Sequence, residues 1–558
     1  MEQPHAKKEI SNGVLSSSVN CSEFPNCVCC KYPSPVSVSA LGPWLDIYSD
    51  KQAANILKDG FTFGFKLGYQ GERVFRESPN LKSISADPQA ALAKVMKEVG
   101  LKRIAGPFSQ IPISDLIISP IGLVPKSEPG KVRLIQHLSF PDGQSINDGI
   151  NPDNCIVKYA SFDLAIQLVV RNGKGALMAK ADIESAFRLL PIHPQDFQLL
   201  GIKVGDSYFV DKALPMGASC SPALFEKFST FVEWVVKRVA NTDNVTHYMD
   251  DFLFLGSCDE NSESSCANLV AKFEGICQKF GIPLSKDKSV GPVSKLTYLG
   301  LEIDSVKQLV LIPDQKLAAI KQKVRSLLQA AEVTLRDLQS VIGSLSFVCK
   351  AVSPGRAFLR RLIDLTCGIK KPWFRLKLSV GAKKDLEMWL LFLDHFNGST
   401  IFPDQAWFES SDLQFFTDSS GALGMGGFFR GKWFQALWPN RNFRRRSIAW
   451  LEFFPILVAV VLWGPQLRGR RIIIRSDNQP VVNIINKQSS RSPEIMKLVR
   501  FFILQCLKSN LAFCAKHIVG RDNEIADSLS RFQMDRFRRL APGADLEPTD
   551  VPQFLWNL

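Results

Sequence analysis

The sequence predicts a multidomain protein that combines α+β and α/β architecture. At 558 residues the chain is too long for a single hydrophobic core. Apolar residues make up 46% of it, enough for most of the chain to fold. Two separate groups of apolar strands end in acidic residues, and in the second group strands and helices alternate, as is typical of α/β domains.

Composition and charge indicate the partner and the compartment. Lys and Arg exceed Asp and Glu by 68 − 54 = 14 charges, which fits a polyanionic partner such as nucleic acid, although many basic proteins only have a solvated basic surface. The longest uncharged apolar run, 453–464, is too short for a membrane span and contains a proline. The N-terminus lacks the apolar core of a secretory signal. We therefore expect an intracellular protein, cytoplasmic or nuclear, with no membrane contact and with reduced cysteines.

The N-terminal region carries the weakest pattern. Residues 1–43 are rich in Ser, Pro, Asn and Cys and show no sustained period, which predicts a disordered tail. Its cysteines can offer four thiolates to zinc, but their spacing is not a paired-knuckle pattern, and loose reduced cysteines are the simpler interpretation. These cysteines are Cys21, Cys27, Cys29 and Cys30. Residues 44–118 show helical patterns and give no signal of their role.

A basic hairpin is predicted next. Two short apolar strands, within 119–126 and 131–135, flank a turn that contains Pro129 and Gly130. This hairpin presents Lys126 and Arg133 from opposite arms. Such a pair of cations can hold a triphosphate, and two merely exposed basic side chains are the alternative.

The first acidic group centres on Asp250 and Asp251, which lie side by side within the apolar, aromatic-rich stretch 246–256. Its alternation predicts two strands with the acids in the tight turn of a hairpin. Two buried anions this close need a compensating cation, usually a divalent metal. A solvated Asp-Asp turn is the alternative, but the flanks are too hydrophobic for it. Asp182 ends another apolar strand, where loops readily hold catalytic acids.

The segments after these acids are predicted from their turns and helical periods. Residues 214–225 form a Gly- and Pro-containing turn into a long helix, and Gly217 allows close backbone approach. A helix at 266–280 precedes strands at 284–288 and 297–303. Residues 314–396 look helical throughout and carry many Lys and Arg.

The second acidic group lies in the α/β pattern of residues 409–535. Each acid stands at the end of an element or inside an apolar helix, and Glu452 is the sole charge in the helix predicted at 448–462. A lone Glu in such a helix is poorly explained by packing. Each acid alone is more often a cap or turn residue, whereas four together favour a metal site at one edge of the sheet. The four are Asp418, Glu452, Asp477 and Asp527.

From about Ser119 to Arg531 these blocks resemble, in the same order, the reverse transcriptase and ribonuclease H modules of retroelements. The box Tyr248-Met249-Asp250-Asp251 is the most specific motif. The blocks 119–126 and 517–531 are most similar to DIRS-type elements, which use a tyrosine recombinase, with caulimovirus-like and Ty3-like polymerases as near alternatives. The resemblance implies a right-hand polymerase of fingers, palm and thumb, then a helical connection and a ribonuclease H-like mixed-sheet domain.

The resemblance also implies roles for single residues of the polymerase. Asp182, Asp250 and Asp251 would be its catalytic, metal-binding acids. The other matching positions would surround the incoming deoxynucleoside triphosphate, with Phe187 blocking a ribose 2′-hydroxyl and Met216 standing where retroviral enzymes commonly have Gln. These positions are Lys126, Arg133, Phe187, Met216, Gly217 and Lys288.

In the second module Asp418, Glu452, Asp477 and Asp527 match the four metal ligands of ribonuclease H, and His517 matches a mobile histidine that assists product release. Each of the two sites would bind two Mg²⁺ ions, or Mn²⁺ in their place. The implied partners are an RNA template, a DNA primer and the RNA–DNA hybrid.

The expected domains are a tail (1–43), a helical extension to the fingers (44–118), fingers and palm (119–313), a helical thumb and connection (314–408), a ribonuclease H-like domain (409–535) and a C-terminal tail (536–558). Two other functions stay open at this point. One is a catalytically inactive, domesticated polymerase-like protein that binds nucleic acid. The other is a polymerase without preference for an RNA template.

Overall fold

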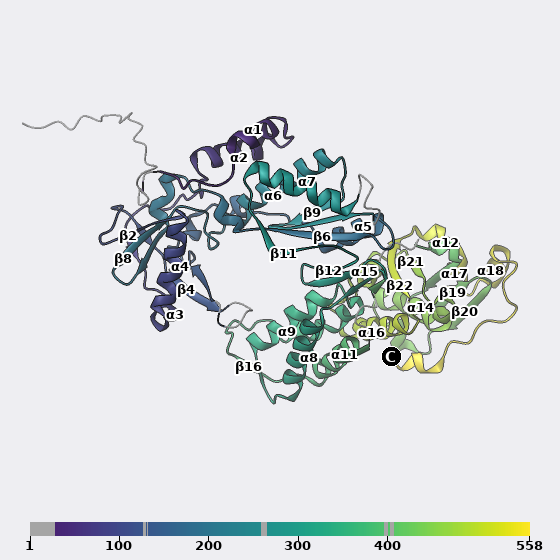
Figure 1. Cartoon of the computed structure of the whole chain (residues 1–558). Coiled ribbons are helices and arrows are strands. Elements are labelled where there is room, and N and C mark those ends of the chain that lie inside the picture. The colour runs from purple at the N-terminus through teal and green to yellow at the C-terminus, as the bar shows by residue number, and fades with distance from the viewer. Residues whose placement is uncertain are drawn as a thin grey trace, which may run out of the picture. The chain divides into compact units, whose positions relative to one another are not determined.

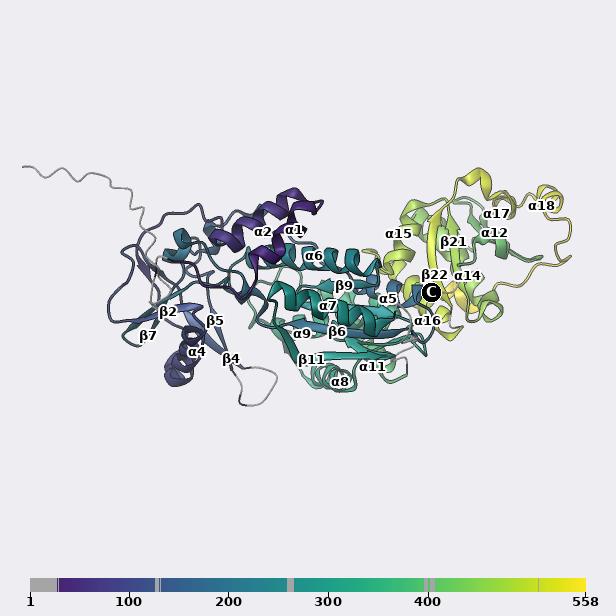
Figure 2. The same cartoon turned by 45° about the horizontal axis from the view of Figure 1, so that its top comes forward.

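The computed structural model describes residues 28, 30–125, 130, 132–257, 265–395, 400–401, 407–509 and 511–558. The chain forms two compact units, shown in two orientations in Figures 1 and 2. The first unit holds residues 1–165 and 177–293, and the second holds 166–176 and 294–558. Both contain sheets covered by helices, which confirms the expected mixed α and β multidomain fold.

An antiparallel sheet of order β11-β6-β10-β9 is the centre of the first unit. Helices α6 and α7 lie side by side against it, as Figure 1 shows. Phe252 and Phe254 of the sheet pack on Phe273 of α7, with ring centroids 4.9 Å apart in each pair. The elements are β6 (Leu177–Ile183), α6 (Ser221–Ala240), β9 (Val245–Tyr248), β10 (Asp251–Gly256), α7 (Cys266–Phe280) and β11 (Leu284–Val293).

This unit also contains a second sheet of order β1-β3-β7-β8-β2 and a separate hairpin β4-β5, with α3 and α4 packed on them. The predicted hairpin is therefore present, with Val124 opposite Arg133. The strands are β1 (Arg76–Glu77), β2 (Ile104–Phe108), β3 (Ile117–Ile118), β4 (Ile121–Pro125), β5 (Val132–Gln136), β7 (Gly201–Val204) and β8 (Ser207–Asp211), and the helices are α3 (Lys82–Ala86) and α4 (Pro88–Gly100).

The expectation of a disordered tail up to residue 43 is wrong at its C-terminal end. Helix α1 (Val38–Ile47) begins at the N-cap Ser37, whose side chain accepts a hydrogen bond from the backbone of Ala40. Leu41 is fully buried, and the backbone N–H of Ser37 donates to the carbonyl oxygen of Phe280 at 2.9 Å. This order depends on tertiary packing, which a short segment does not reveal in its own period. Helix α2 (Lys51–Phe63) follows, and residues 1–27 and Cys29 lie outside the described residues.

The second unit begins with the sheet β12-β13-β14-β17 and a group of helices. Residues 314–396 are not helical throughout, because β15 pairs with β16 in a short antiparallel ladder. The strands are β12 (Lys295–Tyr298), β13 (Leu301–Asp304), β14 (Leu309–Leu311), β15 (Val333–Thr334), β16 (Arg375–Leu376) and β17 (Thr400–Ile401), and the helices are α8 (Asp314–Gln329), α9 (Leu335–Val348), α10 (Arg360–Asp364) and α11 (Val380–His395).

The α/β part of the second unit has an antiparallel ladder β18-β19-β20 and a parallel pair β21-β22. Helix α14 packs against β18, β19 and α16. The strands are β18 (Phe415–Ser419), β19 (Gly424–Phe429), β20 (Lys432–Leu437), β21 (Arg471–Ser476) and β22 (Ala512–His517). The helices are α12 (Ser410–Leu413), α13 (Arg441–Arg444), α14 (Ile448–Trp463), α15 (Gln479–Lys487), α16 (Pro493–Lys508), α17 (Glu524–Ser530) and α18 (Met534–Leu540).

The C-terminal residues are not the separate tail expected for 536–558. Phe537 of α18 is fully buried, and its ring lies 5.1 Å from that of Trp433. Farther on, the ring of Trp556 lies 5.4 Å from that of Phe454 on α14. Aromatic packing of this kind adds a sizeable apolar contact to the domain, so the domain extends beyond residue 535.

One helical stretch among the described residues, Ile448–Leu467, is long and apolar enough to cross a membrane by length and composition. This stretch is 67% buried within the protein. Core helices of soluble proteins pass the same test, so the observation is weak evidence for a membrane span.

Candidate metal centres

The hairpin β9–β10 places two acids at its turn. Tyr248 pairs with Asp251, so Met249 and Asp250 form the connecting turn. The hairpin is present as predicted, but Asp251 is the first residue of β10 and not part of the turn. Met249 has a left-handed φ of 58°, which is uncommon for a residue with a Cβ but is found in tight hairpin turns. The backbone carbonyl of Asp250 accepts a hydrogen bond of 3.1 Å from the N–H of Ile183. This bond ties the turn to the end of β6.

Strand pairing brings a third acid to this turn. Asp251 lies directly opposite Asp182 in the antiparallel ladder of β10 and β6. Asp182 is buried, with 6% of its surface exposed. From the other neighbouring strand, β11, the ammonium of Lys288 donates to both carboxylate oxygens of Asp182 at 2.9 and 3.0 Å. The sequence-predicted residues Asp182, Asp250, Asp251 and Lys288 are therefore neighbours.

The electrostatics of this cluster favour a bound cation. Burial raises the pKa of Asp250, and the charges of Asp182 and Asp251 raise it further, while Lys288 opposes this effect. Burial and the charge of Asp182 likewise raise the pKa of Asp251. The hydrogen bond to Asp182 raises the pKa of Lys288, which keeps its charge. Three crowded acids against one exposed ammonium leave a negative site suited to a divalent ion with oxygen ligands.

The other predicted polymerase positions lie on three elements of the same unit. Phe187 is in a short 3₁₀ turn, Ala186–Leu189, and its ring contacts that of Phe225 edge to face at 5.4 Å. Met216 is 56% exposed in the turn before α6. Arg133 is exposed on β5. Lys126 lies outside the described residues, so its role stays a prediction.

The close packing of the turn at residue 217 requires a glycine. A Cβ on Gly217 would lie 2.2 Å from the carbonyl oxygen of Gln136, far inside van der Waals contact. Asn147 holds the same turn, since its side-chain amide donates to the carbonyl of Gly217 at 3.0 Å and its amide oxygen accepts from the N–H of Ser219 at 2.9 Å. Nothing in the sequence pattern indicates this role of Asn147.

We expect Gly217→Ala to destabilise the first unit by about 1–3 kcal/mol, the usual cost of forcing extra atoms into a packed site. The backbone oxygen of Gln136 cannot move without disturbing strand β5. Denaturant unfolding of the two proteins measures the difference. Gly275→Ala in α7 is the matched control, because its Cβ would meet nothing within 4 Å and alanine favours a helix. An unchanged midpoint for Gly217→Ala would contradict the close approach.

A buried histidine lies on β9, close to the turn between β9 and β10. The Nδ1 of His247 is bound to the carboxylate of Glu233, and its Nε2 lies 3.2 Å from that of Glu226. Both glutamates come from α6, and Glu233 also binds Lys237 at 2.6 Å. Burial lowers the pKa of His247, but the two glutamates outweigh it and raise the pKa to about 9. A charged imidazolium therefore joins α6 to β9, the strand that leads into the turn at Asp250.

This arrangement predicts a pH-dependent stability. The pKa of His247 in the folded chain, about 9, lies above its ordinary value of 6.5, so its contribution is fully present below pH 6.5 and is lost as pH rises through about 9. We expect the free energy of unfolding to fall by on the order of 2–3 kcal/mol across this window. Urea unfolding at several pH values should show this slope in the unmodified chain and lose it in His247→Gln. His137→Gln, at an exposed position, should keep it; equal slopes in all three proteins would contradict the charged triad.

The second cluster forms in the α/β part of the second unit. Asp418 stands on β18, Glu452 on α14 and Asp477 directly after β21. One carboxylate oxygen from each lies within 4.8 Å of the others. Helix α14 packs on β18, which brings a helix acid against the strand-end acids. Of the parts of the chain that the structure describes, this is the one group of three or more acids, histidines or cysteines with ligand atoms this close.

Burial and mutual repulsion oppose the ionisation of all the acids of this cluster at the same time. Burial, followed by the charges of Asp418 and Asp477, raises the pKa of Glu452 to about 9. Burial also raises the pKa of Asp418 to about 7, although its Oδ2 accepts a hydrogen bond of 2.6 Å from the hydroxyl of Ser530. The hydroxyl of Ser530 orients Asp418, a role that the sequence does not indicate. Three carboxylates this close together are suited to bind a divalent cation, whose positive charge would compensate theirs.

Asp527 does not join this group of three. Its carboxylate accepts from Arg531 at 2.6 Å and from Arg536 at 2.7 Å. Burial raises the pKa of Asp527, but these two hydrogen bonds outweigh it and lower the pKa overall. Its charge still acts on Asp418, so Asp527 lies near the cluster while two guanidinium groups hold it.

His517 lies beside the acid cluster of the second unit. The parallel register pairs Ser476 with His517, one residue before Asp477. The Nε2 of His517 lies 3.0 Å from the backbone carbonyl oxygen of Asp477. The exposed histidine is thus beside the acid cluster, at the end of β22.

Both clusters offer carboxylate oxygens, the ligands that Mg²⁺ prefers. Such sites are typical of proteins that transfer or hydrolyse phosphoryl groups with divalent metal. Residues 124–303 match the family model described as reverse transcriptase (RNA-dependent DNA polymerase). The chain therefore contains a reverse transcriptase domain, and the predicted resemblance is confirmed for this segment, which includes Asp182, Asp250 and Asp251.

Curated relatives agree with this match. Protein P of duck hepatitis B virus (strain China) is 28% identical over 170 residues, which are 30% of this chain and 20% of that protein. The genome polyprotein of Petunia vein clearing virus (isolate Shepherd) is 21% identical over 364 residues, 64% of this chain and 15% of that protein. The chain thus spans a fifth or less of the length of these relatives.

Solved structures with a similar course of the chain include a foamy viral protease-reverse transcriptase in complex with double-stranded DNA. It is 15% identical with a TM-score of 0.49, and the match covers 88% of this chain and 83% of that one. The foamy viral protein in complex with an RNA/DNA hybrid gives a TM-score of 0.46 at 15% identity, with 86% and 62% covered.

Proposed function

We propose that this chain is an RNA-directed DNA polymerase of a retroelement, with a ribonuclease H site in its second unit. One observation carries the proposal: strand pairing sets Asp182 beside Asp251 inside the segment that matches the reverse transcriptase family. The template would be RNA, the primer DNA, and the substrates deoxynucleoside triphosphates.

In the polymerase site, Asp182, Asp250 and Asp251 would hold the metal. Mg²⁺, or Mn²⁺ in its place, supplies charge that acidifies an attacking hydroxyl and stabilises the negative charge developing at phosphorus, commonly as a pair of ions. The chain holds the three acids rigidly, through the β10–β6 ladder and the bond from Ile183 to Asp250. Lys288 keeps a positive charge at Asp182.

The surrounding residues would bind and select the nucleotide. The exposed guanidinium of Arg133 can pair with phosphate oxygens in a bidentate manner. The ring of Phe187 is fixed against Phe225, so it can exclude a ribose 2′-hydroxyl by its bulk. The backbone of Gly217 is held by Asn147, and Met216 offers an exposed apolar side chain instead of an amide.

In the second site, Asp418, Glu452 and Asp477 would hold the metal, with Asp527 as a fourth acid once it is freed from Arg531 and Arg536. The reaction would be hydrolysis of RNA paired to DNA. His517, exposed beside Asp477, would assist release of the cut strand. Recognition of the hybrid would depend on backbone shape and on the 2′-hydroxyl groups.

We propose a DIRS-type origin from the motifs 119–126 and 517–531, although the relatives described above are viral. An intracellular site of action, cytoplasmic or nuclear, is proposed from the composition.

Templates of different chemistry test the proposal against its two alternatives. The purified chain with Mg²⁺ is given the same DNA primer on an RNA template and on a DNA template of identical sequence. An RNA-directed polymerase extends the primer on RNA. Extension on DNA alone would reject the RNA-directed function, and binding without any extension would indicate the inactive nucleic-acid-binding protein.

A further inference from the structure

A strongly basic loop, residues 368–379, joins α10 to α11 in the second unit. It contains four basic residues and no acidic residue. All four are exposed. They are Lys370, Lys371, Arg375 and Lys377.

Two aromatic rings stand among these cations. Trp373 is 72% exposed and Phe374 is 50% exposed. Large apolar side chains this exposed, and adjacent to each other, are uncommon on a free surface and often mark an interaction site. The loop therefore combines flat apolar faces with positive charge.

The backbone of the loop is held in place. Strand β16 within it pairs with β15, placing Val333 opposite Leu376. The carbonyl oxygens of Pro372 and Phe374 accept hydrogen bonds of 3.0 and 2.9 Å from the N–H groups of Arg336 and Leu335 at the start of α9. A surface fixed in this way loses little conformational entropy when it binds a partner.

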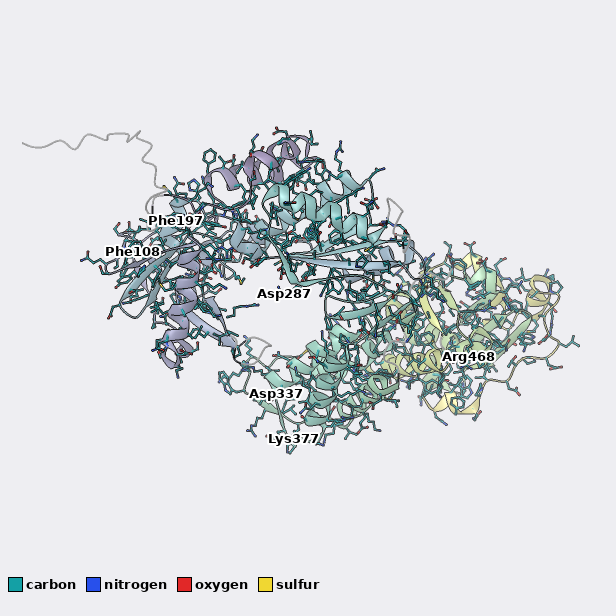
Figure 3. All side chains as sticks on the ribbon, in the orientation of Figure 1. Phe108, Phe197, Asp287, Asp337, Lys377 and Arg468 are labelled. Atoms are coloured by element: carbon teal, nitrogen blue, oxygen red, sulfur yellow. The ribbon has the colours of Figure 1, made fainter. Side chains whose placement is uncertain are left out.

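Among the described residues, no carboxylate forms an ion pair with any of the four cations. Within the described parts of the chain, none of them lies within 4.0 Å of a carboxylate oxygen. Asp337, in the first turn of α9 beside this ladder, accepts a hydrogen bond from the hydroxyl of Thr334 at 2.6 Å. Figure 3 shows the labelled side chain of Lys377 at the outer edge of the helices α8, α9 and α11.

We propose that this basic loop binds single-stranded nucleic acid, with phosphates on the four cations and an unpaired base stacked on Trp373. Cations that track a phosphate backbone, together with aromatic rings that accept a base of any sequence, are the features of single-strand binding surfaces. Bases in a duplex are stacked on each other and cannot cover the ring. The inference rests on the proposed function only for the choice of nucleic acid over other polyanions.

Binding of a fluorescein-labelled oligouridylate of about 12 nucleotides to the full chain, followed by anisotropy, tests the proposal. Trp373→Ala/Phe374→Ala should weaken binding at least about ten-fold, within the range expected when a stacking ring is removed. Lys371→Gln/Lys377→Gln should weaken binding and make its salt dependence shallower, by about 0.7 in slope for each phosphate that is no longer neutralised. Phe554→Ala, which removes another ring of the second unit that is 52% exposed, should change neither quantity.

Several outcomes would overturn the proposal. Unchanged affinity in the double aromatic variant, with a thermal unfolding curve like that of the unmodified chain, would remove the stacking surface. If the loop variants lose binding to vesicles rich in phosphatidylserine but retain oligouridylate binding, the loop binds a membrane instead. The test is independent of catalysis, since oligouridylate binding is measured without a primer or deoxynucleoside triphosphates. If the chain does not extend primers, the proposal for the loop is therefore unaffected. If the loop variants bind oligouridylate with unchanged affinity, the proposed polymerase function is unaffected.

Discussion

Asp250→Asn is expected to abolish primer extension by this chain. The substitution keeps the size of the side chain and removes its negative charge, so the acid cluster loses affinity for divalent metal at the turn of β9 and β10. Metal charge contributes several kcal/mol to the stabilisation of the transition state, and each ~1.4 kcal/mol is a factor of ten in rate. We therefore expect the rate to fall by about 10³ or more, measured as single-nucleotide addition to a labelled primer.

The hairpin itself should survive this substitution. The bond from Ile183 reaches the backbone carbonyl of Asp250, which asparagine retains. Asp243→Asn is the matched control, because Asp243 is exposed just before β9 and should leave the rate unchanged. If Asp250→Asn extends primers as the unmodified chain does, the assignment of the acids to the polymerase site is wrong.

Asp477→Asn should have the second large effect and act on a different reaction. Asp477 lies within 4.8 Å of Asp418 and Glu452 through their carboxylate oxygens, and its charge raises the pKa of both. Without that charge the cluster attracts a divalent cation more weakly, so cleavage of RNA in an RNA–DNA hybrid should fall by about 10² to 10³. Primer extension should continue, because Asp477 belongs to the second unit.

This prediction is measured on a 5′-labelled RNA annealed to DNA, with cleavage products separated by size. Asp550→Asn, an exposed acid of the same unit, should cleave normally. Asp250→Asn should also cleave normally, so Asp250→Asn should lose only primer extension and Asp477→Asn only cleavage. Persistent cleavage by Asp477→Asn would reject the ribonuclease site.

The elements around the first site could be predicted from local patterns. Alternating apolar residues and the Asp250-Asp251 pair indicate a tight hairpin, and the structure has it. The pairing of Asp251 with Asp182 could not be predicted from the residues alone, because it depends on the strand order β11-β6-β10-β9. The resemblance to reverse transcriptases implies that Asp182 and Asp251 lie together. His247 appears in the sequence only as one residue of an alternating strand, and its partners come from helix α6.

At the second site, too, the sequence indicates the acids but not all of their partners. Strand ends and an isolated helix acid indicate Asp418, Glu452 and Asp477, which the fold brings together. Spacing along the chain cannot reveal that Arg531 and Arg536 hold Asp527, since this depends on the packing of α17 and α18. The early start of α1 likewise depends on contacts with distant residues such as Phe280.

The most direct test of the whole account is one reaction with the unmodified chain, Mg²⁺, all four deoxynucleoside triphosphates and a DNA primer annealed to an RNA template, each strand carrying its own label. The primer should lengthen while the RNA shortens, and EDTA should stop both. A primer that keeps its original length with either Mg²⁺ or Mn²⁺ would contradict the central claim.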